Sequence, residues 1–301
     1  MNCLFLYNPN SGKGKLKKKI SYVRRHLEEK FERVDIVETK SAEDMEAHAR
    51  DGAERYDVIL FSGGDGTFNN VLTGIGDRKI PLGYIPSGTT NDIAHSVGIP
   101  RSVKGALKVI LAGHSAPLDC LRVNDTHYVM YIAAAGAFTE VTYNTPQKSK
   151  KLFGRIAYAV QGLKKNMKFK VFPVRCHCGG QVSESHGVLV FVVNGKWVAG
   201  MPVNKKGSMT DGRLEVAVVK QVKRPNVFQR LGKYFSVAAV MLFGVRVKKR
   251  DVEFMRGDSV LIETSDDVVW DFDGEEGPRG NVDIRLLRGH VNLFVPKNKK
   301  L

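Results

Sequence analysis

Apolar segments and helical segments alternate along the first part of the chain. Short apolar runs, each long enough for one buried strand, occur at residues 3–7, 34–37, 58–61 and 81–86. Between the runs, apolar residues recur every three or four positions, as Ile20, Val23, Leu27 and Phe31 do. Repeated strand–helix units of this length are typical of a doubly wound parallel sheet, whose ligands bind at the carboxyl ends of the strands. The pattern therefore predicts an N-terminal α/β domain over residues 1–117.

From about residue 117 the pattern changes to strands separated by turns of Asn, Gly and Asp. We predict strands at residues 118–123, 128–134, 169–176, 187–194, 213–220, 252–264, 268–272, 282–287 and 291–295, and helices at 151–167 and 226–244. Several of the strands alternate between apolar and polar residues, which favours a mainly antiparallel β sandwich with inserted helices. We assign this second domain to residues 118–290, followed by a C-terminal segment, 291–301, that can return to the first domain.

The predicted helix at 226–244 has a wide apolar face. Its members are Phe228, Leu231, Phe235, Ala238, Met241 and Leu242. Such a face either packs in a core or contacts a membrane, and the sequence leaves both interpretations open. The longest nearly uncharged stretch, 234–245, is too short to span a bilayer.

Composition limits the class of protein. A chain of 301 residues with 43% hydrophobic residues can form two domains of ordinary size. Four scattered cysteines do not form a disulfide framework, and the N-terminus has no signal-peptide pattern, so we expect a cytoplasmic protein. At most it associates peripherally with a membrane.

The formal net charge of +16 requires either an anionic partner or a solubility role for the surface lysines. Basic residues cluster at 13–25, 148–155 and 246–250, which favours recruitment to an anionic membrane surface. No basic motif interleaved with aromatic residues is present, so nucleic acid is not an expected partner.

A glycine-rich loop follows the predicted strand at 58–61. It reads Gly63-Gly64-Asp65-Gly66-Thr67, and a helical pattern comes directly after it. Glycines let backbone N–H groups approach a phosphate, and a helix N-terminus adds partial positive charge. A carboxylate beside a phosphate needs a cation between them, so the loop suggests phosphate with a divalent metal. The alternative interpretation is a tight strand-to-helix turn. The dinucleotide-binding pattern does not fit, because Asn69 stands where a small residue is required.

Three further groups of acids stand out in the second half: Asp119, Asp211, and the segment 271–277. A single acid in a turn is usually a turn former. Together with a phosphate loop, however, they suggest phosphoryl transfer with Mg²⁺ and a base that positions the acceptor.

Five motifs in order along the chain resemble the diacylglycerol kinase catalytic-domain family, which includes bacterial lipid kinases and the sphingosine and ceramide kinases. They are Asn8-Pro9-Asn10-Ser11-Gly12, the glycine-rich loop at 63–67, Ile85-Pro86-Ser87-Gly88-Thr89-Thr90-Asn91-Asp92, Asp211-Gly212 with Leu214, and Asp273-Gly274-Glu275. NAD kinases and phosphofructokinases share the glycine–acid loop or close variants of it. The segment from Pro86 to Asp92 distinguishes the lipid kinases.

The resemblance implies a two-domain enzyme with its active site in the interdomain cleft. The implied ATP contacts are Asn8, Pro9, Asn10, Ser11, Gly12, Thr39, Gly63, Gly64, Asp65, Gly66, Thr67, Asn69 and Thr89. Asp65 would also join a magnesium and water network, and Glu275 would be the general base facing the lipid hydroxyl. A structural magnesium site would use Asp211, Ser208 and the carbonyl of Arg213, and Asp119 would link it to the cleft.

The expected function is thus ATP- and Mg²⁺-dependent phosphorylation of a lipid hydroxyl at an anionic membrane surface, with diacylglycerol as the first candidate acceptor and phosphatidic acid as product. The alternatives are a soluble small-molecule kinase resembling NAD kinase, or a catalytically silent family member that binds nucleotide or membrane. An edge strand of the second domain could pair two chains in a homodimer.

Overall fold

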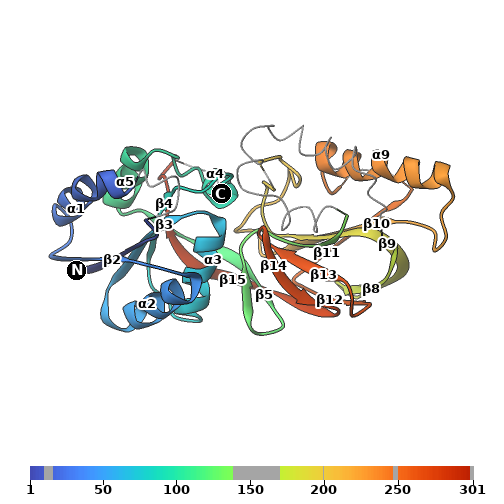
Figure 1. Cartoon of the computed structure of the whole chain (residues 1–301), viewed down its shortest axis with the longest axis horizontal. Coiled ribbons are helices and arrows are strands. Elements are labelled where there is room, and N and C mark those ends of the chain that lie inside the picture. The colour runs from blue at the N-terminus through green and yellow to red at the C-terminus, as the bar shows by residue number, and fades with distance from the viewer. Residues whose placement is uncertain (10–15, 138–169, 199, 247–249, 299–301) are drawn as a thin grey trace. The chain divides into compact units, whose positions relative to one another are not determined.

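The computed structural model describes residues 1–9, 16–137, 170–198, 200–246 and 250–298 (Figure 1). The chain divides into two compact units. Unit 1 comprises Met1–Cys120 and Leu287–Leu301, and unit 2 comprises Leu121–Leu286. The units thus divide after residues 120 and 286, and the domain limits expected after residues 117 and 290 stay a prediction.

Unit 1 is built on parallel strands in the order β4–β3–β1–β2. The strands are β1 (Asn2–Tyr7), β2 (Arg33–Glu38), β3 (Val58–Gly63) and β4 (Leu82–Pro86), and the end of β15 (Val282–Phe294) lies beside β4. The helices are η2 (Lys17–Lys19), α1 (Ile20–Glu28), α2 (Ala42–Arg55), α3 (Asp65–Ile75), α4 (Asp92–Val97) and α5 (Val103–Ala112). Helices α2 and α3 pack together on one side of the sheet, and α1 and α5 lie on the other (Figure 1). This arrangement confirms the predicted parallel α/β fold.

Local sequence explains these elements. All residues of β3 and β4 are buried, as continuous apolar runs predict. Ser41 caps α2 by accepting the Asp44 N–H at 3.2 Å, and Ser102 caps α5 by accepting the Gly105 N–H at 3.1 Å.

Unit 2 is a β sandwich of mainly antiparallel strands, also as predicted. Its strands are β5 (Ser115–Val123), which begins in unit 1, β6 (His127–Val129), β7 (Ile132–Gly136), β8 (Phe172–Cys178), β9 (Gln181–Val193), β10 (Leu214–Lys220), β11 (Val252–Gly257), β12 (Ser259–Thr264), β13 (Val269–Phe272), β14 (Glu275–Arg279) and the first part of β15. The long strand β9 pairs with β8 through its first half and with β7 and β10 through its second half. The fully buried Trp270 lies in the core, with its indole N–H donating to the Gly280 carbonyl at 2.8 Å.

Several strand limits differ from those predicted from periodicity. The run at 252–264 is two strands, β11 and β12, because the chain changes partners at Asp258: β11 pairs with β10, whereas β12 pairs with β8 and β15. The runs at 282–287 and 291–295 are one strand, β15, because Gly289 adopts a φ of +54° inside it without ending it. The run at 128–134 is divided into β6 and β7, and β14 was not predicted. The predicted helix at 151–167 lies outside the described residues.

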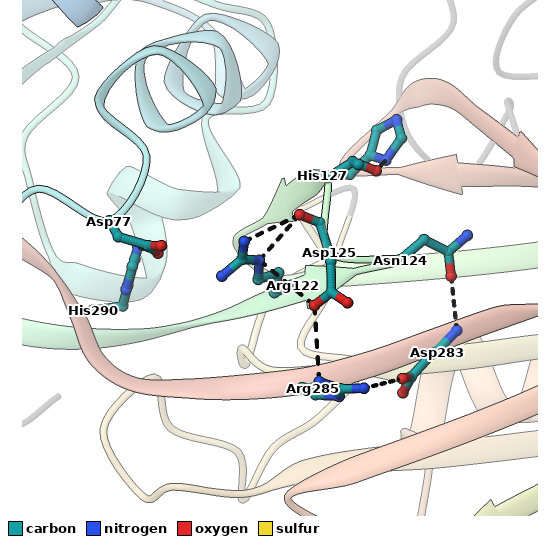
Figure 2. Close-up of polar contacts among 9 residues, drawn as sticks. Asp77, Arg122, Asn124, Asp125, His127, Asp283, Arg285 and His290 are labelled. Carbon is teal, nitrogen blue, oxygen red and sulfur yellow. Dashed lines mark hydrogen bonds and ion pairs between the residues drawn. The ribbon is translucent and has the colours of Figure 1, made fainter.

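The hairpin of β5 and β6 is joined to β15 by backbone and ionic contacts (Figure 2). Asn124 and Asp125 have φ of +49° and +57°, a conformation that Asn and Asp adopt more readily than most residues. The Asn124 side chain accepts the Asp283 N–H at 2.9 Å, and Asp283 pairs with Arg285 at 2.6 Å. Residues 124–126 therefore form the turn that follows the strand predicted at 118–123, and the Asn124 side chain fixes the adjacent strand.

Candidate active site

The register of the parallel strands brings four predicted site loops to one edge of unit 1. Tyr7 at the end of β1 lies opposite Glu38 of β2 and Ser62 of β3, and Gly63 lies opposite Pro86 of β4. The residues that follow these ends are Asn8, Thr39, Gly64 and Ser87. Parallel pairing thus places the predicted nucleotide loops side by side, as the doubly wound fold requires.

The two glycine loops touch through their backbones. The Gly63 carbonyl accepts the N–H of Ser87 at 2.8 Å and that of Gly88 at 3.1 Å. A Cβ added to Gly88 would lie 2.5 Å from the Gly64 Cα, so no larger residue fits at position 88 without displacing the loop. Gly64 and Gly88 therefore allow the two loops to lie in direct contact.

Asp65 joins the glycine-rich loop to the first turn of α4. Its carboxylate is 6% exposed and accepts the Thr90 hydroxyl at 3.1 Å, the Asp92 N–H at 3.1 Å and the Ile93 N–H at 3.2 Å. Burial raises the pKa of Asp65, and these donors act in the opposite direction. The carboxylate thus joins the glycine-rich loop to the start of α4.

Asn91 and Tyr84 also hold this loop, and sequence reasoning gave neither a role of its own. Asn91 is buried with φ of +52°; its side chain accepts the Gly88 N–H at 2.9 Å and donates to the Gly88 carbonyl at 3.0 Å. The Tyr84 hydroxyl lies 3.1 Å from the Gly63 carbonyl and 3.3 Å from Asn91 Oδ1. Asn adopts a positive φ more readily than most residues, and this property could have been used to find Asn91.

Two of the predicted ATP contacts present buried polar atoms. Within the described part of the chain, neither Thr39 Oγ1 nor Asn69 Oδ1 has a hydrogen-bond partner. A buried polar atom without a partner costs about 1–3 kcal/mol, so both atoms are suited to a ligand. Asn8 and Pro9 are half-buried, Thr89 is exposed, and Asn10, Ser11 and Gly12 lie outside the described residues.

In unit 2, the loop that carries Glu275 is fixed by Asp273. The buried Asp273 carboxylate accepts backbone N–H groups of Met130 at 2.6 Å, Tyr131 at 3.0 Å and Ile132 at 2.9 Å. Glu275 is exposed at the start of β14, immediately after the turn. The two acids of this motif therefore differ, because one fixes the turn and the other faces solvent.

The groups expected to hold a structural magnesium ion are already bonded within unit 2. Asp211 Oδ2 pairs with Arg256 at 2.8 Å, and Asp211 Oδ1 accepts the Arg213 N–H at 3.0 Å. The Ser208 hydroxyl lies 2.8 Å from the Thr210 hydroxyl and accepts the Thr210 N–H at 3.1 Å. A guanidinium beside the only carboxylate of the set repels a divalent cation, so these donors as folded do not fit magnesium.

Arg256 belongs to a larger ionic group around Glu215. Glu215 is 1% exposed and contacts Arg256 at 3.3 Å, Arg246 at 2.5 Å and Asn204 at 2.6 Å. Its charge is thus balanced by two arginines. Over the described residues, no group of three His, Cys, Asp or Glu side chains could hold a metal ion.

Asp119 lies in unit 1 on β5. It is 3% exposed, and its Oδ1 accepts the Gly289 N–H at 2.8 Å. The nearby His290 contacts the Gly76 carbonyl at 3.2 Å and lies 3.8 Å from Asp77 (Figure 2). Asp119 therefore fixes the kink of β15 at Gly289, and its predicted link to a magnesium site stays a prediction.

Comparison with known proteins assigns the family. The diacylglycerol kinase catalytic domain matches residues 2–123, and the YegS C-terminal NAD kinase beta sandwich-like domain matches residues 132–295. The chain belongs to the diacylglycerol kinase catalytic-domain family. It is a kinase, as the motifs led us to expect.

Similarity extends over the whole chain. It is 29% identical to a diacylglycerol kinase of Bacillus subtilis, over 98% of this chain and 96% of that protein. It is also 29% identical to a diacylglycerol kinase of Staphylococcus aureus strain MRSA252, over 97% of this chain and 92% of that protein. A crystal structure of a diacylglycerol kinase from Bacillus anthracis superimposes with a TM-score of 0.79 at 26% identity, over 98% of this chain and 97% of that one.

Replacing Asp65 tests its role in fixing α4. We expect Asp65→Ala to lower the free energy of unfolding by about 2–4 kcal/mol, because the α4 N–H groups lose their acceptor. Urea denaturation measures the change. The control Asp51→Ala removes an exposed acid on α2 and should change stability by less than about 0.5 kcal/mol. Equal stability of the two variants would contradict the structural role.

Chelation tests the ionic group of unit 2. Because arginines neutralise Asp211 and Glu215, we expect EDTA to leave the melting temperature of the ligand-free protein unchanged. Arg256→Ala should lower the free energy of unfolding by about 1–3 kcal/mol, since a buried carboxylate loses one of its charged donors. A fall in the wild-type melting temperature on chelation, reversed by Mg²⁺, would instead show a bound structural metal.

Proposed function

We propose that this kinase transfers the γ-phosphate of ATP to the hydroxyl group of a membrane lipid, with diacylglycerol as the first candidate acceptor. The observation that carries the proposal is the edge of unit 1 where the loops after β1, β2, β3 and β4 end in register. Relatives named diacylglycerol kinase, which match nearly the whole chain, supply the class of acceptor. The product would be phosphatidic acid.

Unit 1 supplies the groups for ATP. The N-terminus of α3 lies within the glycine-rich loop, at Asp65, and a helix N-terminus favours an anion. The buried Thr39 Oγ1 and Asn69 Oδ1 offer hydrogen bonds to the nucleotide. Mg²⁺ bound with the phosphates would neutralise the charge that develops during transfer. Asp65, at the start of α3, would join the water network around this ion.

The lipid hydroxyl is the nucleophile. Its oxygen attacks the γ-phosphorus, the bond from that phosphorus to the β–γ bridging oxygen breaks, and ADP leaves. Glu275 accepts the hydroxyl proton, which an ordinary carboxylate can do as the proton is lost in the transition state. Asp273 positions Glu275 by fixing the turn that precedes it.

Direct assay tests the function. Purified protein is incubated with ATP, Mg²⁺ and mixed micelles that contain diacylglycerol, a prenol, a sphingoid base or ceramide, and in parallel with NAD in place of lipid. We expect phosphorylation of a lipid and no NADP. If ATP binds but no lipid is phosphorylated, the proposal fails, and NADP formation would point to the soluble kinase alternative.

Substitution of Glu275 tests the proton acceptor. We expect Glu275→Gln to lower kcat about 10²–10⁴-fold with little change in ATP affinity, because the amide cannot accept the proton at neutral pH. The neighbouring and equally exposed Glu276 provides the matched control Glu276→Gln, which should retain activity. If only the control variant loses turnover, the base is Glu276.

A further inference from the structure

One long segment of unit 2 combines basic residues with exposed aromatic side chains. Between Glu215 and Asp251 there is no acidic residue. The basic residues in this interval are Lys220, Lys223, Arg224, Arg230, Lys233, Arg246, Lys248, Lys249 and Arg250. The interval contains α9 (Val227–Phe243), which packs against β10 and is drawn in orange in Figure 1.

Three phenylalanines of α9 are exposed to solvent. The exposed fractions are 84% for Phe228, 67% for Phe235 and 66% for Phe243, and Val222 just before the helix is 48% exposed. Aromatic side chains are rarely exposed to this extent, and several together mark an interaction surface. At 3.6 residues per turn, Phe228 and Phe235 lie within about 20° of each other around the helix axis, and Phe243 lies about 60° from Phe228.

A different side of α9 attaches it to the body of unit 2. Lys233 pairs with Asp251 at 2.7 Å, and the Ser236 hydroxyl donates to the same carboxylate at 2.5 Å. Val237 and Val240 are buried. Around the axis, these four residues lie about 80–180° from Phe228, with Ser236 at the near limit and Val237 at the far one. The helix is therefore held firmly through one side while its phenylalanines project from another.

The start of the helix is fixed as well. Asn226 and Gln229 form a reciprocal capping box, with hydrogen bonds of 2.8 and 3.0 Å. Lys223 and Arg224 are exposed just before this cap, and Arg250 is exposed after the helix. In the part of the chain that the structure describes, no carboxylate lies within ion-pair distance of these three cations. The phenylalanines are thus flanked by cations that are free to meet an anionic surface.

We propose that α9 lies on the surface of an anionic phospholipid bilayer, with Phe228, Phe235 and Phe243 inserted among the acyl chains and Lys223, Arg224 and Arg250 at the phosphates. We call this surface the α9 face. The proposal rests on the proposed function only because a kinase for membrane lipids must reach a bilayer. The phenylalanines extend over about 22 Å along the helix. Interfacial helices combine a basic polar side with Phe or Leu in this way. Among the described residues, no helix is long and apolar enough to cross a membrane.

Charge favours a bilayer over a second copy of the chain. Two identical α9 faces would bring the same cations together, within molecules that each have a formal charge of +16. Anionic lipid instead neutralises them, with a contribution of roughly fivefold in affinity from each basic residue near the surface. Anionic lipid is therefore the proposed partner of the α9 face.

Vesicle binding tests the proposal. The whole chain is mixed, without ATP, with vesicles that can be sedimented. One set contains phosphatidylcholine alone, and in the other set about one lipid in three is phosphatidylglycerol. We expect binding only to the anionic vesicles. Phe228→Ser combined with Phe235→Ser should weaken it about a hundredfold, because each buried Phe contributes at least about tenfold. Lys223→Gln combined with Arg224→Gln should weaken it about 25-fold.

Matched controls use exposed apolar residues of unit 2 outside the α9 face. Val182 on β9 is 59% exposed and Leu261 on β12 is 41% exposed. Val182→Ser combined with Leu261→Ser should bind vesicles as the wild type does. Thermal unfolding of all variants should coincide with that of the wild type, since every substituted side chain is exposed.

Different results would contradict the membrane role of the α9 face and the proposed lipid kinase activity. Activity on short-chain diacylglycerol dispersed as monomers should be unchanged by the Phe substitutions, while activity on vesicles falls with binding. If the wild type binds vesicles through the phenylalanines but phosphorylates no lipid, the proposed function fails and the α9 face stands. The α9 face is overturned if the wild type ignores anionic vesicles or if the Phe variant binds as tightly as the wild type. Conversion of a dimer to a monomer by the Phe substitutions, with vesicle binding unchanged, would overturn it in favour of a second copy.

Discussion

Unit 1 depends on the contact between two backbone loops, at Gly63-Gly64 and at Ser87-Gly88. Parallel pairing of β3 and β4 brings these loops together, and the absence of a Cβ at Gly88 lets them touch. Their hydrogen bonds through the Gly63 carbonyl fix the edge of the sheet at which the nucleotide loops end. A larger residue at position 88 would separate the loops and displace Asn91, whose side chain holds Gly88 from both sides. The proposed ATP site is therefore shaped by backbone geometry before any side chain contacts a ligand.

A buried carboxylate stabilises the loops of both units in the same manner. Asp65 in unit 1 accepts two backbone N–H groups and a hydroxyl, and Asp273 in unit 2 accepts three backbone N–H groups. Each acid follows or precedes a glycine in a motif that resembles a catalytic signature. A carboxylate can satisfy several N–H donors at once, which a short neutral side chain cannot do. Such an acid can be essential to a kinase without contacting the reacting atoms.

The charges of unit 2 fall into two groups with different roles. Arg246 and Arg256 balance the buried Glu215 and the exposed Asp211, so these arginines stabilise the fold and leave little opportunity for a metal ion. Lys223 and Arg224 are exposed before α9 in the sequence and Arg250 is exposed after it. The basic residues that give the large net charge therefore do not all have the same role. Some neutralise internal acids, and others are available to an anionic surface.

The sequence by itself determined the parallel sheet, the sandwich and the order of the kinase motifs. These features depend on local periodicity and on short motifs, which a linear chain displays directly. The strand limits around Asp258 and Gly289 were wrong, because whether a strand ends or continues at such a position depends on the strands that pair with it on each side. Likewise, the sequence around an acid in a turn does not show whether the carboxylate binds an arginine, a backbone N–H or a metal. Only the tertiary structure distinguished Asp65 and Asp273 from Glu275, paired Asp211 with Arg256, and left the phenylalanines of α9 exposed, since each outcome depends on residues distant in the sequence.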